Sequence, residues 1–109
     1  IAHVSPAVLA SGNTAAWAGP AGYSVCRFTS NADGTSTVQG IVAPLDARYL
    51  VLINVGAFNT TINNQDAGAA AADNIKTSTG AAVVMAANDT MTLWYDLTSA
   101  FWRQITTAA

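Results

Sequence analysis

The sequence has few charged side chains, and glutamate is absent altogether. Charged residues make up 9% of the chain and its formal net charge is −2, whereas roughly 25% charged residues is usual in soluble domains. Its four cations are scattered singly, which excludes the basic stripe that would track a phosphate backbone: Arg27, Arg48, Lys76 and Arg103. We therefore expect no nucleic-acid partner, and so little charge favours large contacts with other proteins.

Cysteine and histidine occur once each, which removes most catalytic and metal-binding chemistry. Cys26 cannot form an internal disulfide, and within an apolar strand pattern its simplest interpretation is a small core residue. A dyad of Cys26 with His3 would require the N-terminal segment to fold back onto a buried thiol. The sequence shows no zinc spacing, carboxylate pair or phosphate-binding glycine loop. We therefore predict no catalytic residue, no metal site and no cofactor.

Long hydrophobic runs are also missing. The most apolar stretch reads YLVLINV, which is the length of a strand and far short of the ~20 residues of a membrane-spanning helix. We therefore expect no membrane contact. No cationic segment followed by an apolar run opens the chain, so we expect no signal peptide there, and because Ile1 is not an initiator methionine we expect that residues once preceded it.

The sequence does contain short alternating apolar patterns separated by turn residues, which are typical of β-strands. Residues 1–22 are rich in Ala, Gly, Ser and Pro without a sustained period, and we interpret them as an extended attachment arm. Residues 23–109 hold seven or eight short strands, which predicts an all-β domain, a small β-sandwich of jelly-roll-like fold. No internal repeat at a fixed period is visible.

Three segments of this domain carry specific expectations. Residues 48–55 are apolar on both faces, which predicts a central strand. Residues 23–28 and 36–42 alternate on either side of a turn at 29–35, which predicts a first hairpin. Residues 31–35 of this turn resemble a calcium loop only faintly. Residues 66–80 fit either one helical turn or a long surface loop.

A second hairpin is predicted at the C-terminal end, where residues 90–96 and 101–105 alternate around small, turn-forming residues. Asp96 and Arg103 can face each other across this hairpin. The side chains predicted to fill the core between the sheets are Leu93, Tyr95, Phe101 and Ile105.

Aromatic side chains offer the one visible means of binding a ligand, because indole and phenol rings can stack on sugar rings. Aromatics on the strands of a small sheet more often belong to the core or to cross-strand pairs. Trp17, which lies outside the regular strand patterns, and Trp102 are the candidate glycan-stacking residues. A carbohydrate-binding module for host receptor recognition is therefore the alternative function.

The order of features over the last two-thirds of the chain resembles a module of tailed-bacteriophage virion surface proteins, found in tail fibres and in capsid fibres or spikes. The features are a Gly-led loop, an L-x-L-x-N strand, a second apolar strand, a loop with alanine and asparagine, a third apolar strand, and a closing pair with L-x-Y-D and W-R. They correspond to Gly40, 50–54, Ile62, 71–74, 83–85, 93–96 and 102–103. One departure is that Ile75 and Lys76 stand where the module often has an arginine after its asparagine.

This resemblance implies a non-enzymatic bacteriophage structural protein at the virion surface, either a capsid decoration or head fibre protein or a tail-fibre module. Phage fibres and spikes are usually trimers, so the resemblance also implies a homotrimer. The predicted arm of residues 1–22 would then bind other virion proteins of the capsid or tail, because an uncharged segment of small residues can lie in a groove or add to a sheet edge.

Overall fold

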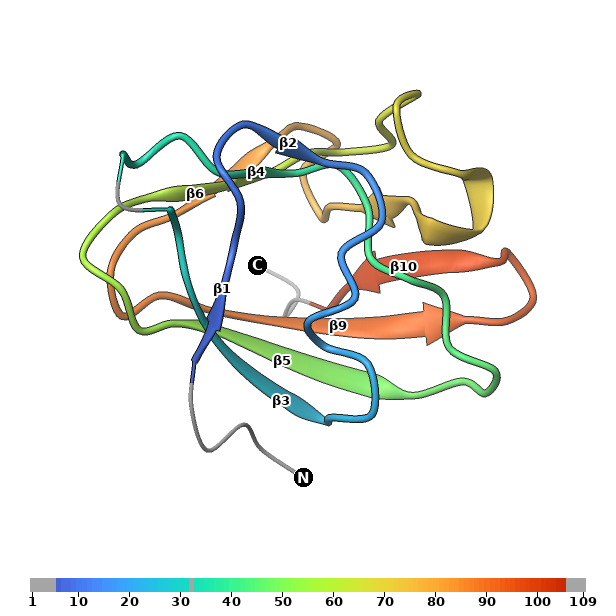
Figure 1. Ribbon diagram of the computed structural model, residues 1–109. Helices are drawn as coiled ribbons and strands as arrows, with labels where there is room; N and C mark the ends of the chain where they lie inside the picture. Colours follow the sequence, from blue (N-terminus) through green and yellow to red (C-terminus); the bar gives the residue numbers. More distant parts are fainter. Residues whose placement is uncertain (1–5, 32, 106–109) are drawn as a thin grey trace.

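The computed structural model describes residues 6–31 and 33–105, which form two β-sheets that face each other (Figure 1). These residues are all-β, as predicted, apart from one turn of 3₁₀ helix, η1 (Ala71–Asp73). The six-stranded sheet has the order β1 (Ala7–Val8), β3 (Val25–Thr29), β5 (Tyr49–Asn54), β9 (Thr90–Asp96), β10 (Phe101–Gln104) and β7 (Ile75–Lys76). The four-stranded sheet has the order β2 (Asn13–Thr14), β4 (Thr37–Val38), β6 (Thr60–Ile62) and β8 (Val83–Met85).

From β1 to β8 the chain crosses to the other sheet after every strand. β1, β3 and β5 pair in parallel, and so do β2, β4 and β6. Asn13, Thr37 and Thr61 are neighbours across the four-stranded sheet, so the step between successive coils is constant in this sheet. In the six-stranded sheet the step is not constant, because Ala7 pairs with Phe28 and Val25 with Val51. Trp17 and Ile41 form a parallel bridge with the same step as the four-stranded sheet. The first part of the sandwich is therefore wound like a solenoid.

This winding corrects three predictions. A jelly roll is built from antiparallel strands, whereas the first three strands of each sheet here are parallel. The first hairpin is wrong, because β3 and β4 belong to different sheets. An internal repeat does exist in space, although the residues at its equivalent positions differ. Alternation within a strand indicates which side chains point inward, but it carries no information about which strand lies alongside.

The C-terminal strands close the sandwich with antiparallel pairs. β9 lies between β5 and β10, and β8 pairs with β6. The predicted hairpin of residues 90–105 is confirmed by the β9–β10 pairing, and β5 is an interior strand of the larger sheet, as predicted. The segment 66–80 contains both η1 and the short strand β7.

The inward face of β10 differs from the prediction. Trp102 is the buried residue of this strand, and it pairs across the hairpin with buried Tyr95. Phe101 is half-buried on the opposite face, and Ile105 is 44% exposed. Side chains alternate strictly along a strand. The prediction placed the first residue after the turn on the inward face, so it exchanged the inward and outward residues of β10. The predicted core positions Leu93 and Tyr95 are confirmed.

The predicted arm is part of the sandwich wherever the structure describes it. β1 adds to the edge of the six-stranded sheet beside β3, and β2 adds to the four-stranded sheet beside β4. Leu9 and Trp17 are only 2% and 5% exposed, inside the hydrophobic core. Burial of one leucine side chain contributes about 1.5–3 kcal/mol, so residues 6–22 stabilise the domain and are not a separate arm. Residues 1–5 lie outside the described part.

The sole helix within residues 6–31 and 33–105 is the three-residue η1, so none of the described segments is a helix long and apolar enough to cross a membrane.

Gly40 lies where three corners of the winding come together. A Cβ atom at this position would lie 2.7 Å from the carbonyl oxygen of Ala15, 2.7 Å from the Cβ of Ala69 and 2.8 Å from the carbonyl oxygen of Asp73. Two of these atoms are main chain and cannot turn aside. The residue must therefore be glycine because of the space available.

We expect Gly40→Ala to destabilise the domain by about 1–3 kcal/mol, since overpacking a well-packed interior costs this much. The free energy of unfolding from urea denaturation is the measurement. Lys76→Ala is the control: this side chain is exposed, and its loss should change stability by no more than about 0.5 kcal/mol. Equal stability of the Gly40 variant and the natural protein would contradict the close approach of the corners.

The predicted contact between Asp96 and Arg103 is confirmed as an ion pair across the β9–β10 hairpin. The Nε of Arg103 lies 2.8 Å from the Oδ2 of Asp96. Asp96 also accepts hydrogen bonds from Ser99 and from the backbone amide of Thr98. The hydrogen bond from Arg103, followed by those from Ser99 and Thr98, holds the pKa of Asp96 below its ordinary value.

A carboxylate whose pKa is lower in the folded than in the unfolded state stabilises the fold when the pH is above its ordinary pKa. This stabilisation is lost as the pH falls through the lower pKa of the folded state. We therefore expect acid to destabilise the natural protein below about pH 4, and Asp96→Asn to show less of this loss. Urea midpoints at neutral and acid pH measure it. Asp46→Asn, at an exposed carboxylate without a hydrogen bond in the described residues, is the matched control. If Asp96→Asn follows the pH curve of this control, the ion pair does not contribute.

Candidate functional site

Among the described residues, the single cysteine is buried in the core. Cys26 lies in β3 and is fully buried, as expected for a core residue, and desolvation raises the pKa of its thiol to about 12. Such a thiol is not the thiolate that a nucleophile requires. Its one possible partner, His3, lies outside the described residues. Within residues 6–31 and 33–105, no three His, Cys, Asp or Glu side chains gather in a group that could hold a metal ion.

The two tryptophans predicted to stack on glycans are both buried. Trp17 is 5% exposed and packs edge-on against Phe28, with ring centroids 5.3 Å apart. Trp102 is 2% exposed and makes the same kind of contact with Tyr95 at 5.1 Å. Neither indole presents an open ring face as the protein is folded. Trp102 differs from Trp17 in that it lines a cavity.

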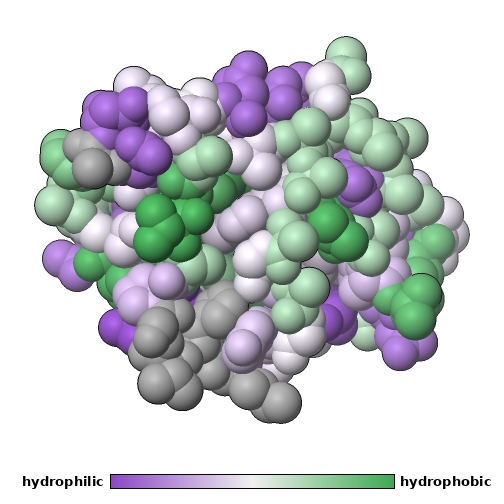
Figure 2. Space-filling model, viewed as in Figure 1, coloured by the Kyte–Doolittle hydropathy of each residue, from purple (hydrophilic) through white to green (hydrophobic). Residues whose placement is uncertain are grey.

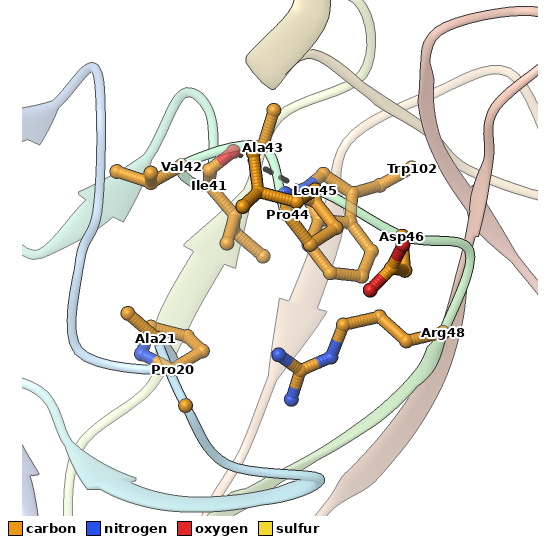
Figure 3. Close-up of a pocket in the computed structure, with 11 residues that line it drawn as sticks. Pro20, Ala21, Ile41, Val42, Ala43, Pro44, Leu45, Asp46, Arg48 and Trp102 are labelled. Carbon is orange, nitrogen blue, oxygen red and sulfur yellow. Dashed lines mark hydrogen bonds between the residues drawn. The ribbon is translucent and has the colours of Figure 1, made fainter.

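This cavity has a volume of about 300 Å³ and lies between two successive corners of the winding (Figure 3). The corner between β2 and β3 contributes Pro20, Ala21 and Gly22, and the corner between β4 and β5 contributes residues 41–46 and Arg48. Each corner contributes one proline to the lining, Pro20 from the first and Pro44 from the second. The cavity is thus a space between stacked corners.

Trp102 forms the core side of the cavity. Its Nε1 donates a hydrogen bond to the carbonyl oxygen of Ile41 at 3.1 Å, drawn as a dashed line in Figure 3. Tyr95 holds the indole from within the core, and its own hydroxyl donates to the carbonyl oxygen of Ala72 at 2.9 Å. The only polar atom of the indole is therefore already bonded, and Trp102 is held in a fixed orientation with very little of its surface exposed to the cavity.

Two charged residues line the same cavity, Arg48 and Asp46. In Figure 3 the Arg48 side chain extends toward Pro20 and Ala21, below the indole. Its Nη2 donates to the carbonyl oxygen of Tyr23 and so joins the start of β5 to the preceding corner. Asp46 is exposed, and its carboxylate has no hydrogen bond or ion pair within the described residues. The cavity therefore combines an apolar wall with a donor and an acceptor.

Sequence reasoning did not find Arg48 and Asp46. Asp46 lies in a corner without periodicity, after Pro44 interrupts the strand pattern, and Arg48 was included in the predicted central strand of residues 48–55. No residue spacing shows that Trp102, far later in the chain, packs beside this corner.

A second surface is the outward face of the six-stranded sheet, here called the outer face. Across its long strands, Val25 lies beside Val51, and Tyr49 lies beside Trp94. Ile53 continues the apolar surface on β5, and Val8 extends it at the β1 edge. Val8 is 72% and Tyr49 62% exposed. Charged side chains also lie on this face, with Arg27 beside Ile53, Asp96 beside Phe101, and Arg103 beside Lys76.

The side of the molecule seen in Figure 2 is different. Its hydrophobic side chains form several small, separate groups between hydrophilic and neutral ones.

The family comparison agrees with this architecture. The sequence model of the phage depolymerase C-terminal beta sandwich domain matches residues 7–103, which includes β1 and most of β10. The chain matches no curated protein and no solved structure. The match covers well over half of the chain, both sheets and the corners around the cavity. This chain therefore belongs to the family of phage depolymerase C-terminal beta sandwich domains.

Proposed function

We propose that this domain is a non-enzymatic structural module of a phage tail fibre, exposed at the virion surface, in which three copies associate through the outer face. The observation that carries the proposal is the row of apolar side chains on the outward side of β3, β5 and β9. The family match supports a place on the tail. A place on the capsid, as a decoration protein or head fibre, remains a prediction from the sequence resemblance.

The chemistry of the described residues supports a structural role. The buried thiol of Cys26 has a raised pKa, and the charged residues beside the cavity are one acid and one base without a nucleophile. A general acid and base must both reach the reacting atoms. Asp46 and Arg48 do not form such a pair, because arginine stays protonated at all ordinary pH values.

The outer face has an apolar and aromatic part that suits an interface between subunits. The cores of stable interfaces are apolar and rich in aromatic residues, and here Trp94 and Tyr49 lie with valines and isoleucine. Arg27, Lys76, Asp96 and Arg103 lie on the same face and would have to be paired or stay at the rim. A stable contact buries on the order of 800 Å² per partner. A net charge of −2 per chain adds little repulsion between copies, and a closed ring removes the apolar surface without forming filaments. The number three follows from the resemblance to phage fibres and spikes.

We expect the domain to sediment at about three times its mass of 11.2 kDa and Val51→Glu to sediment as a folded monomer. The substitution places a carboxylate on the outer face of β5, where an unpaired buried charge would be costly in the assembly. Val84→Glu is the matched control, because Val84 is 54% exposed on β8 of the other sheet. Analytical ultracentrifugation with circular dichroism gives mass and folding. A monomeric natural domain at micromolar concentration would overturn the trimer.

Attachment to other virion proteins through the N-terminal segment stays a proposal for residues 1–5. Deleting all of residues 1–22 would remove Leu9 and Trp17 from the core and would unfold the domain. We expect deletion of residues 1–5 to leave circular dichroism and the unfolding midpoint unchanged and to lower occupancy on virions. Binding to particles that lack the protein is the measurement, and full occupancy by the truncated protein would contradict the attachment role.

A further inference from the structure

We infer that the first coil of the winding, residues 6–22, can open while the rest of the sandwich stays folded, and that the carboxylate of Asp33 keeps it closed. Neutralising this carboxylate, by acid or by substitution, would release the coil and uncover the edges of β3 and β4 that it covers. An uncovered sheet edge is a surface to which another strand can add. The inference does not depend on trimer assembly, because Asp33 lies in the corner between β3 and β4 and not on the outer face.

The first coil has a neighbouring coil on one side only. β1 pairs with β3, and β2 pairs with β4, over two residues each. The strands of the second coil have partners on both sides, since β3 also pairs with β5 and β4 with β6. Each repeat of a wound structure contacts only its neighbours, and such units can open locally at a lower free energy than global unfolding. The first coil is therefore the part of the winding that can detach with the fewest broken pairs.

The attachments of the first coil are of two kinds. Toward its ends, Leu9 and Trp17 are buried in the core, and each backbone amide donates to a carbonyl of the second coil at 3.0 Å. At its corner, the partners are side chains of residues 33–36. The hydroxyl of Ser36 donates to the carbonyl of Ala10 at 2.7 Å, and this bond does not titrate. The remaining bonds at the corner centre on one carboxylate.

Asp33 organises the side chains that reach the corner of the first coil. Its Oδ2 accepts a hydrogen bond from the hydroxyl of Ser11 at 2.6 Å, and its Oδ1 accepts from the hydroxyl and the amide of Thr35 at 2.7 and 3.0 Å. The same Thr35 hydroxyl accepts from the amide of Gly12 at 3.4 Å. An ionised carboxylate is an acceptor only, whereas a protonated carboxyl or an amide also carries donors. Neither neutral group can therefore accept all three bonds.

The hydrogen bond from Ser11, followed by those from Thr35, holds the pKa of Asp33 below its ordinary value. The carboxylate therefore stabilises the closed coil when the pH is above its ordinary pKa of about 4, and this stabilisation is lost as the pH falls through the lower pKa of the folded state. The segments packed around Asp33 are residues 9–12, the rest of 30–36, and 55–59, whose Phe58 lies beside Gly34. None of these segments contains another titratable or charged side chain.

The test is amide hydrogen exchange followed by NMR on the natural domain and on Asp33→Asn at neutral pH. The amides of Leu9 and Trp17 report on the first coil, and those of Val51 and Val55 report on the pairing of β3 with β5. We expect Asp33→Asn to lower the protection of the first-coil amides at least about threefold relative to the other two, because it removes hydrogen bonds to a charged group.

Asp66→Asn is the matched control. Hydrogen bonds from Asn63 and Gly68 also lower the pKa of Asp66, but its partners lie outside the first coil. Ser11→Ala is the second variant, because it removes the same contact from the other side and keeps the carboxylate. Loss of protection confined to the first coil in Asp33→Asn and in Ser11→Ala supports the inference. Equal loss at all four amides, the same loss in Asp66→Asn, or unchanged protection in Asp33→Asn overturns it.

Acid should act through the same carboxylate. In the natural domain, the protection of the first-coil amides relative to the other two should fall as the pH drops through the pKa of Asp33. Asp33→Asn has no carboxylate at this position, so its ratio should stay constant over the same pH range. An equal pH-dependent fall in both proteins would contradict the role of Asp33.

Discussion

The structure depends on the close approach of three main-chain corners at Gly40 and Ile41. The carbonyl of Gly40 accepts a hydrogen bond from the amide of Trp17 at 3.0 Å, and the amide of Ile41 donates to the carbonyl of Asp73 at 2.9 Å. The carbonyl of Ile41 then accepts the indole N–H of Trp102. One short segment thus joins the preceding coil, the following coil and the closing hairpin. Buried backbone groups must be paired, and no side chain at position 40 would leave room for these pairs.

The close approach of the corners also explains why the cavity and the outer face exist. Stacking the corners leaves a space between the one that holds Pro20 and the one that holds Pro44, and Trp102 of the closing hairpin lies on the core side of that space. The same winding places β3 and β5 side by side in parallel, with Val25 beside Val51 on the outward face. Antiparallel β9 completes that face with Trp94 beside Tyr49. Neither surface contains a sequence motif, since each is assembled from separate coils.

The sequence predicts individual strands better than their arrangement. Alternation located β5, β9 and β10 and the hairpin between the last two, because the partners there are adjacent in the chain. It could not show the parallel pairs, whose partners are separated by a whole coil of the winding. Equivalent positions such as Thr14, Val38 and Ile62 differ in type, so the constant step in the four-stranded sheet leaves no visible repeat. The Ala- and Gly-rich start was misjudged for a related reason: two-residue strands are too short to show a period.

The cavity and the outer face are lined by different side chains because of the geometry of the strand that they share. Arg48 lines the cavity, and the next residue, Tyr49, opens β5 on the outer face. Successive side chains of an extended chain point in opposite directions, so a single peptide unit divides one surface from the other. A carboxylate at position 51 therefore changes only the outer face, and an amide at position 46 changes only the cavity. For the same reason, a group in the cavity and a neighbouring subunit on the outer face would contact different side chains.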